Sequence, residues 1–191
     1  MSAYKFWYCL TWPLVKLIFP YTVRGRENIC EGAALVCCNH SSLLDPVFVG
    51  GAFGRNEQLF FMAKSELFEN FFVAKLFGSV GAFPVKRGEM DINAMRTCIA
   101  HLKSDEKVML FPEGTRVSEE EHIAAKTGAV RLSLKHDVPI IPMYLSSKKK
   151  AFRRSYVVIG KPFKFEKPAG KDYTTCADEL LRRIYELEPK P

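Results

Sequence analysis

The sequence has no run of about 20 uncharged apolar residues, no Cys-x-x-Cys pair, and no internal repeat or low-complexity segment. A membrane-spanning helix needs about 20 mostly apolar residues. The strongest hydrophobic stretch, Tyr4–Tyr21, is interrupted by Lys5, Pro13 and Lys16, so we do not expect it to cross a bilayer. It also lacks a small-x-small cleavage site, which argues against a cleaved signal peptide.

The six cysteines are irregularly spaced, and a bridge between the adjacent Cys37 and Cys38 would be strained. This pattern is typical of a reducing compartment and argues against a disulfide scaffold or a structural zinc site. A chain of 191 residues, 48% of them hydrophobic, can bury the core of a single domain without either.

Positive charge is in excess, because 28 lysines and arginines against 21 acidic residues give a net charge of +7. Such a field attracts phosphate, anionic lipid head groups, nucleic acid or an acidic protein. No recognition-helix, single-strand-binding or RNA-binding motif is present, so we expect no nucleic-acid partner.

The N-terminal stretch is rich in tryptophan and tyrosine, which favour the boundary between hydrocarbon and water. Lys5 and Lys16 can extend from it toward lipid phosphates. We therefore expect residues 1–21 to form an interfacial membrane anchor in one leaflet, followed by a single domain over residues 22–191. The alternative is a helix packed against the core of the domain itself.

Beyond residue 21, short apolar runs alternate with segments of helical periodicity. This alternation predicts an α/β fold with a largely parallel or mixed central sheet flanked by helices, preceded by the N-terminal interfacial membrane helix. The expected strands are Thr22–Arg26, Ala34–Cys38, Gln58–Met62, Val80–Val85, Lys107–Phe111, Ile140–Leu145 and Tyr156–Ile159. The expected helices are Glu66–Phe77, Ile92–Leu102, Ile123–Leu134 and Ala177–Leu187.

In folds of this class, ligands bind beyond the carboxyl ends of strands. His40 and Asp45 follow one expected strand, and on a continuous helix they would lie about 140° apart. Asp45-Pro46 is a good helix opening with Asp as N-cap, so residues 41–44 can form a turn that folds His40 back over the cap. His40 is then a candidate general base whose tautomer Asp45 fixes. The spacing is equally compatible with a capping aspartate and an ordinary loop histidine.

Two further loops follow expected strands. In Pro112-Glu113-Gly114-Thr115-Arg116, the glycine frees the backbone to turn its N–H groups toward an anion, and the arginine offers a planar fork of donors suited to phosphate. Residues 81–88 bring Lys86 and Arg87 to the end of another apolar run. Each loop alone is also compatible with a turn that carries solvated charge.

Together the loops resemble the motifs of the glycerolipid acyltransferase superfamily, in particular the 1-acyl-sn-glycerol-3-phosphate acyltransferases of the PlsC type. The resemblance runs from about residue 23 to about residue 160, and the order of its four motifs is far more specific than any one of them. One departure is Val117, where many members have serine. The motifs are N-H-x4-D at residues 39–45, G-x-F-x-V-x-R at residues 81–87, F-P-E-G-T-R at residues 111–116 and V-P-I-x-P at residues 138–142.

The resemblance implies transfer of a fatty acyl group from acyl carrier protein or coenzyme A to the sn-2 hydroxyl of lysophosphatidic acid, giving phosphatidic acid for phospholipid biosynthesis. It implies a peripheral or monotopic enzyme at the cytoplasmic face of the cell membrane, in contact with membrane lipids. We expect no metal and no cofactor beyond the acyl thioester co-substrate. The implied roles are His40 as base, Asp45 as its orienting partner, Arg116, Arg87, Lys86, Gly114 and Thr115 as phosphate ligands, and Glu113 as acceptor-positioning residue or brace of the loop.

Several alternatives stay open. The acceptor could be glycerol-3-phosphate, another lysophospholipid or a lyso-amino-acid lipid, and a non-catalytic basic membrane-binding protein would need neither His40 nor Asp45. The basic run Lys148–Arg154 could dock acyl carrier protein, the coenzyme A nucleotide or anionic lipid, or form only a solvated face. A covalent route through Cys37 or Cys38 is disfavoured because we expect both to lie in a buried strand. Candidate walls for an acyl-chain channel, or else core residues, are Phe60, Phe61, Phe68, Phe71, Phe72 and Phe77.

Overall fold

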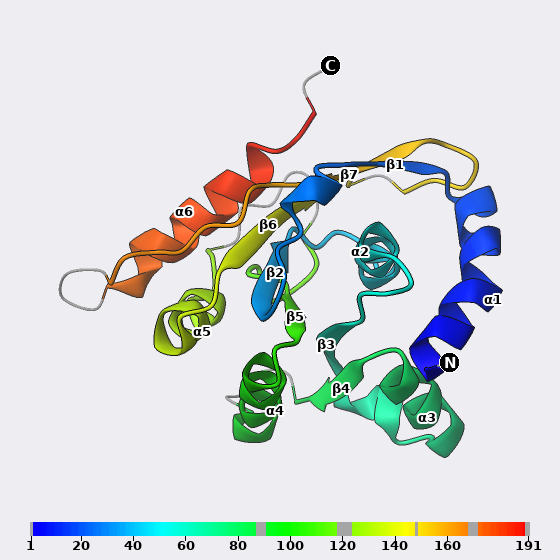
Figure 1. Ribbon diagram of the computed structural model, residues 1–191, viewed down its shortest axis with the longest axis horizontal. Coiled ribbons are helices and arrows are strands. Elements are labelled where there is room, and N and C mark those ends of the chain that lie inside the picture. The colour runs from blue at the N-terminus through cyan, green and yellow to red at the C-terminus, as the bar shows by residue number, and fades with distance from the viewer. Residues whose placement is uncertain (1, 87–90, 118–123, 148, 168–171, 190–191) are drawn as a thin grey trace.

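The computed structural model describes residues 2–86, 91–117, 124–147, 149–167 and 172–189. Its strands form one seven-stranded sheet in the order β1-β7-β6-β2-β5-β3-β4 (Figure 1). Neighbouring strands are parallel except β6 and β7, so β7 and the edge strand β1 run against the other five. The strands are β1 (Tyr21–Arg24), β2 (Ala34–Cys38), β3 (Leu59–Lys64), β4 (Ala82–Val85), β5 (Lys107–Leu110), β6 (Ile140–Leu145) and β7 (Ser155–Ile159).

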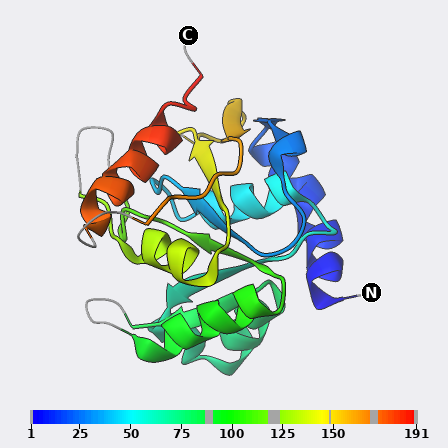
Figure 2. The ribbon, with the colours of Figure 1, turned by 60° about the vertical axis from the view of Figure 1, so that its left-hand side comes forward.

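Helices flank both faces of this mixed sheet, as expected for the α/β class. Helices α4, α5 and α6 cover one face, α2 covers the other, and α1 packs outside α2 (Figures 1 and 2). The helices are α1 (Ala3–Ile18), α2 (Asp45–Phe53), α3 (Phe71–Ser79), α4 (Ile92–Lys103), α5 (Gly128–His136) and α6 (Tyr173–Tyr185).

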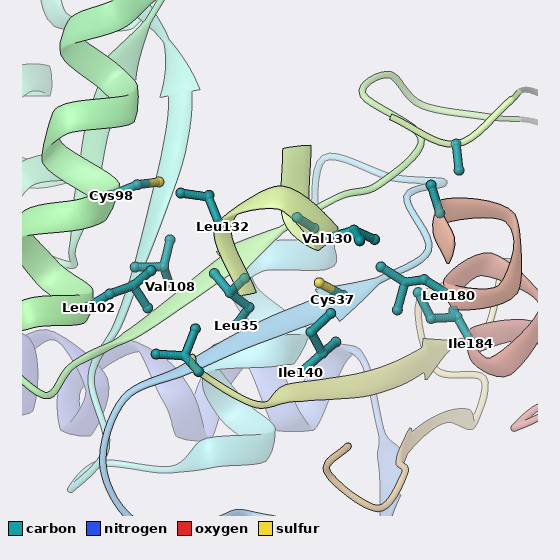
Figure 3. Packing of buried hydrophobic residues seen from close by; sticks show 14 of the residues in the cluster. Leu35, Cys37, Cys98, Leu102, Val108, Val130, Leu132, Ile140, Leu180 and Ile184 are labelled. Atoms are coloured by element: carbon teal, nitrogen blue, oxygen red, sulfur yellow. The ribbon is translucent and has the colours of Figure 1, made fainter. Parts of the chain in front are cut away.

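Strand β2 lies at the centre, and each of its residues is buried. Leu35 and Cys37 face α4, α5 and α6, as the close view in Figure 3 shows, whereas Val36 and Cys38 face α2. A strand that is covered on both faces has no solvent side, which is why its sequence is a continuous apolar run rather than an alternating one.

The seven predicted strands are confirmed, and β2 and β6 have the predicted bounds. The prediction of one continuous helix over Glu66–Phe77 is wrong. The segment forms a 3-10 turn over Ser65–Phe68 followed by the separate helix α3. The break occurs because the Asn70 side chain caps α3 by accepting from the N–H groups of Phe72 and Val73. The helix predicted from residue 123 begins at Gly128, and residue 123 lies outside the described residues.

The chain reverses its direction of travel across the sheet between the neighbouring strands β2 and β5. The connection after β2 passes through α2 on one face, and the connection after β5 passes through α5 on the other. Such a switch point is where open α/β sheets bind ligands. The segments that follow β6, β2 and β5 therefore meet at one edge of the sheet.

Helix α1 packs on the domain with one face and exposes the other. On the inner face, the Tyr4 hydroxyl donates to the Gly54 carbonyl at 2.9 Å, and Trp12 stacks on Tyr8 with ring centroids 5.0 Å apart. The outer face presents four exposed apolar side chains. They are Phe6, Leu10, Leu14 and Leu17. None of the helices in the described part of the chain combines the length and apolarity needed to cross a membrane.

The contact between α1 and α2 depends on the absence of a side chain at Gly51. A Cβ atom there would lie 1.5 Å from the Trp12 ring and 2.4 Å from the Tyr21 hydroxyl. Glycine inside a helix costs about 0.5–1 kcal/mol relative to alanine. Its presence here is explained by the close approach of the indole to the α2 backbone. Gly50, its neighbour, has no atom within 4 Å of its Cβ position.

We expect Gly51→Ala to displace the Trp12 ring and to lower the free energy of unfolding by about 1–3 kcal/mol, the usual cost of overpacking. Gly50→Ala in the same helix should instead stabilise the protein by up to about 1 kcal/mol, because it meets open space. Chemical denaturation followed by tryptophan fluorescence measures both. Equal effects of the two substitutions would contradict the packing role of Gly51.

Candidate active site

Asn39 fixes the start of the loop that follows β2. Its side-chain amide donates to the Leu145 carbonyl at 2.9 Å and its carbonyl accepts from the Leu145 N–H at 2.8 Å. Because Leu145 is the last residue of β6, these two bonds tie the carboxyl ends of two neighbouring strands together. His40 therefore leaves the sheet from a rigid position.

His40 and Asp45 form the pair expected from their spacing. The imidazole Nδ1 lies 2.8 Å from Asp45 Oδ2, and the Asp45 side chain is fully buried. The same oxygen accepts from the backbone N–H groups of Ser41 and Ser42 at 2.7 and 2.8 Å. The turn over residues 41–44 thus folds His40 back toward Asp45.

The expectation that Asp45 is an N-cap is wrong. Leu44 occupies that position in α2, Asp45 and Pro46 open the helix, and the cap makes no side-chain hydrogen bond. The Asp45 carboxylate points back to the preceding turn rather than forward to the helix amides. This orientation makes it available to the imidazole.

The contacts of Asp45 fix its charge and the tautomer of His40. Burial acts to raise the pKa of Asp45, but the hydrogen bond from His40 and the ammonium of Lys149 hold that pKa below its ordinary value. An ionised carboxylate only accepts hydrogen bonds, so a neutral imidazole beside it carries its proton on Nδ1. The lone pair is then on Nε2, which makes no hydrogen bond within the described residues. His40 is thereby arranged as a base.

Glu113 holds the loop after β5 against the loop after β2. Its Oε2 accepts from the His40 backbone N–H at 2.7 Å, and its Oε1 accepts from the Tyr185 hydroxyl at 2.6 Å. Burial raises the pKa of this carboxyl. Because both oxygens are bonded within the protein, the contacts favour bracing over acceptor positioning for Glu113.

The glycine of this loop forms a turn. Gly114 has a φ of 72°, in the left-handed region that suits glycine, and its N–H donates to the Phe111 carbonyl at 2.9 Å. The turn therefore uses the Gly114 N–H itself, and the expectation that N–H groups of this loop face an anion stays a prediction for its other residues. Thr115 and Arg116 follow with exposed side chains.

The Arg116 loop and the His40 loop lie side by side. The Val117 N–H donates to the His40 carbonyl at 2.8 Å, and the Phe111 ring stacks on the imidazole with centroids 3.9 Å apart. Val117 is buried in this contact, so the departure from serine at this position leaves the loop attached to the dyad.

Of the remaining predicted phosphate ligands, Lys86 lies farther along the same edge of the sheet. Lys86 is exposed directly after β4, which is two strands from β5, and its backbone N–H donates to Asp91. Arg87 lies outside the described residues.

Two residues of the site follow no motif and are missed by sequence reasoning. Lys149, expected within a surface-exposed basic run, turns inward and contacts Asp45 Oδ1 at 2.6 Å. Tyr185 reaches Glu113 from the last turn of α6. The only sequence signal for Lys149 is its place shortly after β6, the neighbour of β2.

Cys37 and Cys38 are fully buried in β2, as expected. Burial raises the pKa of both thiols. The thiolate that a covalent route requires is therefore suppressed at neutral pH.

An apolar cavity of about 340 Å³ lies under α1, between α2, α3 and the strands β3 and β5. Its wall includes Leu43 and Pro46, which flank Asp45, so it adjoins the dyad. Of the predicted channel residues, Phe61 and Phe77 line it. Phe71 and Phe72 are instead exposed on α3, and Phe60 stacks on His101.

A histidine base backed by a buried carboxylate, at the switch point of an α/β sheet, is suited to an enzyme that removes a proton from an acceptor group. The sequence matches the model of a family described as Acyltransferase over residues 20–146. The chain belongs to this acyltransferase family, which confirms the resemblance seen in its motifs.

The chain is also similar to individual acyltransferases. The chain is 31% identical over 178 residues to the 1-acyl-sn-glycerol-3-phosphate acyltransferase of Bacillus subtilis, with 88% of each chain covered. It is 33% identical over 129 residues to a probable enzyme of the same name from Mycoplasma pneumoniae, covering 61% of this chain and 46% of the relative.

A solved structure shares the fold. The crystal structure of the 1-acyl-sn-glycerophosphate (LPA) acyltransferase PlsC from Thermotoga maritima superposes with a TM-score of 0.69. The superposition covers 90% of this chain and 73% of the Thermotoga maritima chain, and the two sequences are 22% identical.

Proposed function

We propose that this protein transfers a fatty acyl group from an acyl thioester to the sn-2 hydroxyl of lysophosphatidic acid, giving phosphatidic acid. The observation that supports this most is the 2.8 Å contact between His40 Nδ1 and Asp45, beside the Arg116 loop. The names of the relatives support the same acceptor. The thioester would be that of coenzyme A or acyl carrier protein, which share the same reacting group.

In the proposed reaction, His40 Nε2 takes the proton of the acceptor hydroxyl as the oxygen attacks the thioester carbonyl carbon. The carbon–oxygen bond forms, the carbon–sulfur bond breaks, and the departing sulfur receives the proton from the imidazolium. Asp45 fixes the ring and stabilises its positive charge while it holds the proton. A positioned base is typically worth about 10²- to 10⁴-fold in rate.

Arg116 is the proposed main ligand of the acceptor phosphate. Its side chain is exposed in the loop whose next residue, Val117, bonds the His40 carbonyl. A guanidinium presents paired donors that match two phosphate oxygens. Lys86 and Thr115 would add contacts from the same edge of the sheet, so that the hydroxyl of a bound acceptor faces the base. Arg87, the next residue after Lys86, is proposed as a further phosphate ligand.

The apolar cavity under α1 is the proposed acyl-chain site. Its volume lies within the range of about 300–1,000 Å³ typical of small-molecule pockets. Pro46 and Leu43 form its wall next to the dyad, and Phe61, Phe77 and Met109 also line it. A chain that enters here would keep its thioester end near His40.

We also propose that the protein works as a peripheral or monotopic enzyme, with α1 in the interface of one leaflet. The outer face of α1 exposes Leu10 and Leu14, and Lys16 lies in its last turn. Apolar side chains beside a lysine are typical of helices that lie in a membrane surface. Phe71 and Phe72 of α3 are further exposed apolar side chains.

Replacement of the base tests the proposed chemistry. We expect His40→Ala to lower the rate of transfer from acyl-coenzyme A or acyl carrier protein to lysophosphatidic acid by at least about 10²-fold, with vesicle binding unchanged. His101 is a matched control, because it makes a similar 2.7 Å contact with Glu106 but is not part of the site. His101→Gln should keep its activity. Full activity of the His40→Ala protein would exclude the mechanism.

Replacement of Arg116 tests the phosphate contact. A charge-assisted hydrogen bond is worth roughly 1.5–3 kcal/mol, so Arg116→Ala should raise the KM for lysophosphatidic acid by about tenfold to somewhat over a hundredfold. The KM for monoacylglycerol, which lacks the phosphate, should not change. Steady-state kinetics with both acceptors gives the answer, and an unchanged KM for lysophosphatidic acid would refute the assignment.

Replacement of the outer face of α1 tests the membrane contact. The Leu10→Ser, Leu14→Ser double variant should bind anionic vesicles at least tenfold more weakly, because burial of a leucine contributes about 1.5–3 kcal/mol. Ile92→Ser is the control, since Ile92 has the same 59% exposure as Leu10 but lies on α4, across the sheet. Vesicle flotation measures both, and equal losses would argue against α1 as the docking face.

A further inference from the structure

Lys149 is buried in the connection that follows β6, directly behind the dyad. Its side chain is 1% exposed, and its ammonium lies 2.6 Å from Asp45 Oδ1. The ammonium also donates to the Ser146 carbonyl at 2.6 Å and to Ser41 Oγ at 3.1 Å. The ammonium is thus engaged in an ion pair with Asp45 and in two hydrogen bonds, to Ser146 and Ser41. Lys149 is therefore not available to bind a ligand at the surface.

The two oxygens of the Asp45 carboxylate face different partners. Oδ2 accepts from the His40 imidazole and from two backbone N–H groups, whereas Oδ1 faces Lys149. The carboxylate thus stands between the ammonium of Lys149 and the imidazole of His40. A buried carboxylate without the lysine would draw a proton onto the imidazole or onto itself.

We propose that Lys149 is a positioning residue that neutralises Asp45, so that His40 stays an uncharged base at neutral pH. This inference rests on the proposed function, because it concerns the base of that reaction. The lysine keeps Asp45 ionised and oriented, and it opposes premature protonation of the imidazole by its own charge. Asp45 still stabilises the imidazolium once the acceptor proton has arrived.

The other groups around His40 do not supply a positive charge that could neutralise Asp45. Glu113, from the segment after β5, faces the backbone N–H of His40 and is bonded to Tyr185 of α6. Cys38 of β2 is a buried thiol, and the Phe111 ring covers one face of the imidazole. Among the described residues, Lys149 is the cation in contact with the dyad.

The test compares the titration of His40 in the wild-type protein and in Lys149→Met, which keeps most of the length of the side chain and removes its charge. NMR of histidine-labelled protein follows the His40 signal, which is assigned by its loss in His40→Ala. We expect the midpoint in Lys149→Met to rise by about one to two pH units. The acid limb of the profile of kcat/KM against pH should move by the same amount, with activity recovering above it.

Lys150→Met is the matched control, because it removes the same charge from the exposed neighbouring residue. The titration midpoint of His40 in Lys150→Met should equal that in the wild-type protein. Lys149→Arg keeps the charge and should also titrate like the wild type, which provides the test if Lys149→Met does not fold. A midpoint that stays or falls in Lys149→Met, or that moves equally in Lys150→Met or in Lys149→Arg, would overturn the inference.

The two readouts separate this inference from the proposed function. The NMR titration needs no substrate, so it decides the role of Lys149 even if no acyl transfer to lysophosphatidic acid is found. A shifted midpoint without any acyl transfer would reject the proposed reaction and retain the neutralising role. Acyl transfer with unshifted midpoints would reject the role of Lys149 alone.

Discussion

The site depends on how the buried carboxylate of Asp45 is paired and hydrogen-bonded. A charge without solvent is costly unless it is paired and hydrogen-bonded. The chain meets this requirement with the His40 imidazole, the N–H groups of Ser41 and Ser42, and the Lys149 ammonium. These partners come from the segments after β2 and β6, so satisfying one carboxylate also fixes how two loops meet at the edge of the sheet. The turn, the ring orientation and the inward path of Lys149 are consequences of the same constraint.

Much of the frame could be predicted from the sequence, because it is encoded locally. A strand buried on both faces is a continuous apolar run, and β2 and β6 were therefore predicted with their observed bounds. The pairing of His40 with Asp45 was also within reach, since the two residues are only five positions apart and a proline follows the second. The capping role assigned to Asp45 failed because a sequence does not show toward which side a carboxylate at a helix start turns.

The rest of the site depends on contacts that no local pattern encodes. Lys149 and Tyr185 follow their carboxylate partners by more than 70 residues, and only the packing of β6 and α6 brings them close. The positions of the phenylalanines were also not predictable from a local pattern. The orientation of α3 about its axis decides that Phe77 lines the cavity and that Phe72 faces outward. Gly51 weakens its helix when judged by propensity, and its purpose becomes visible only when Trp12 is in place.

Helix α2 joins two functions in one rigid rod. Its first residue, Asp45, backs the imidazole, and Gly51, about 9 Å along the axis at 1.5 Å per residue, receives Trp12 of α1. If α1 lies in the plane of a membrane surface, as we propose, α2 holds that plane at a fixed distance from the imidazole of His40. An amphiphile embedded in that plane would present its hydroxyl group at a depth set by the protein, whatever the length of its tail.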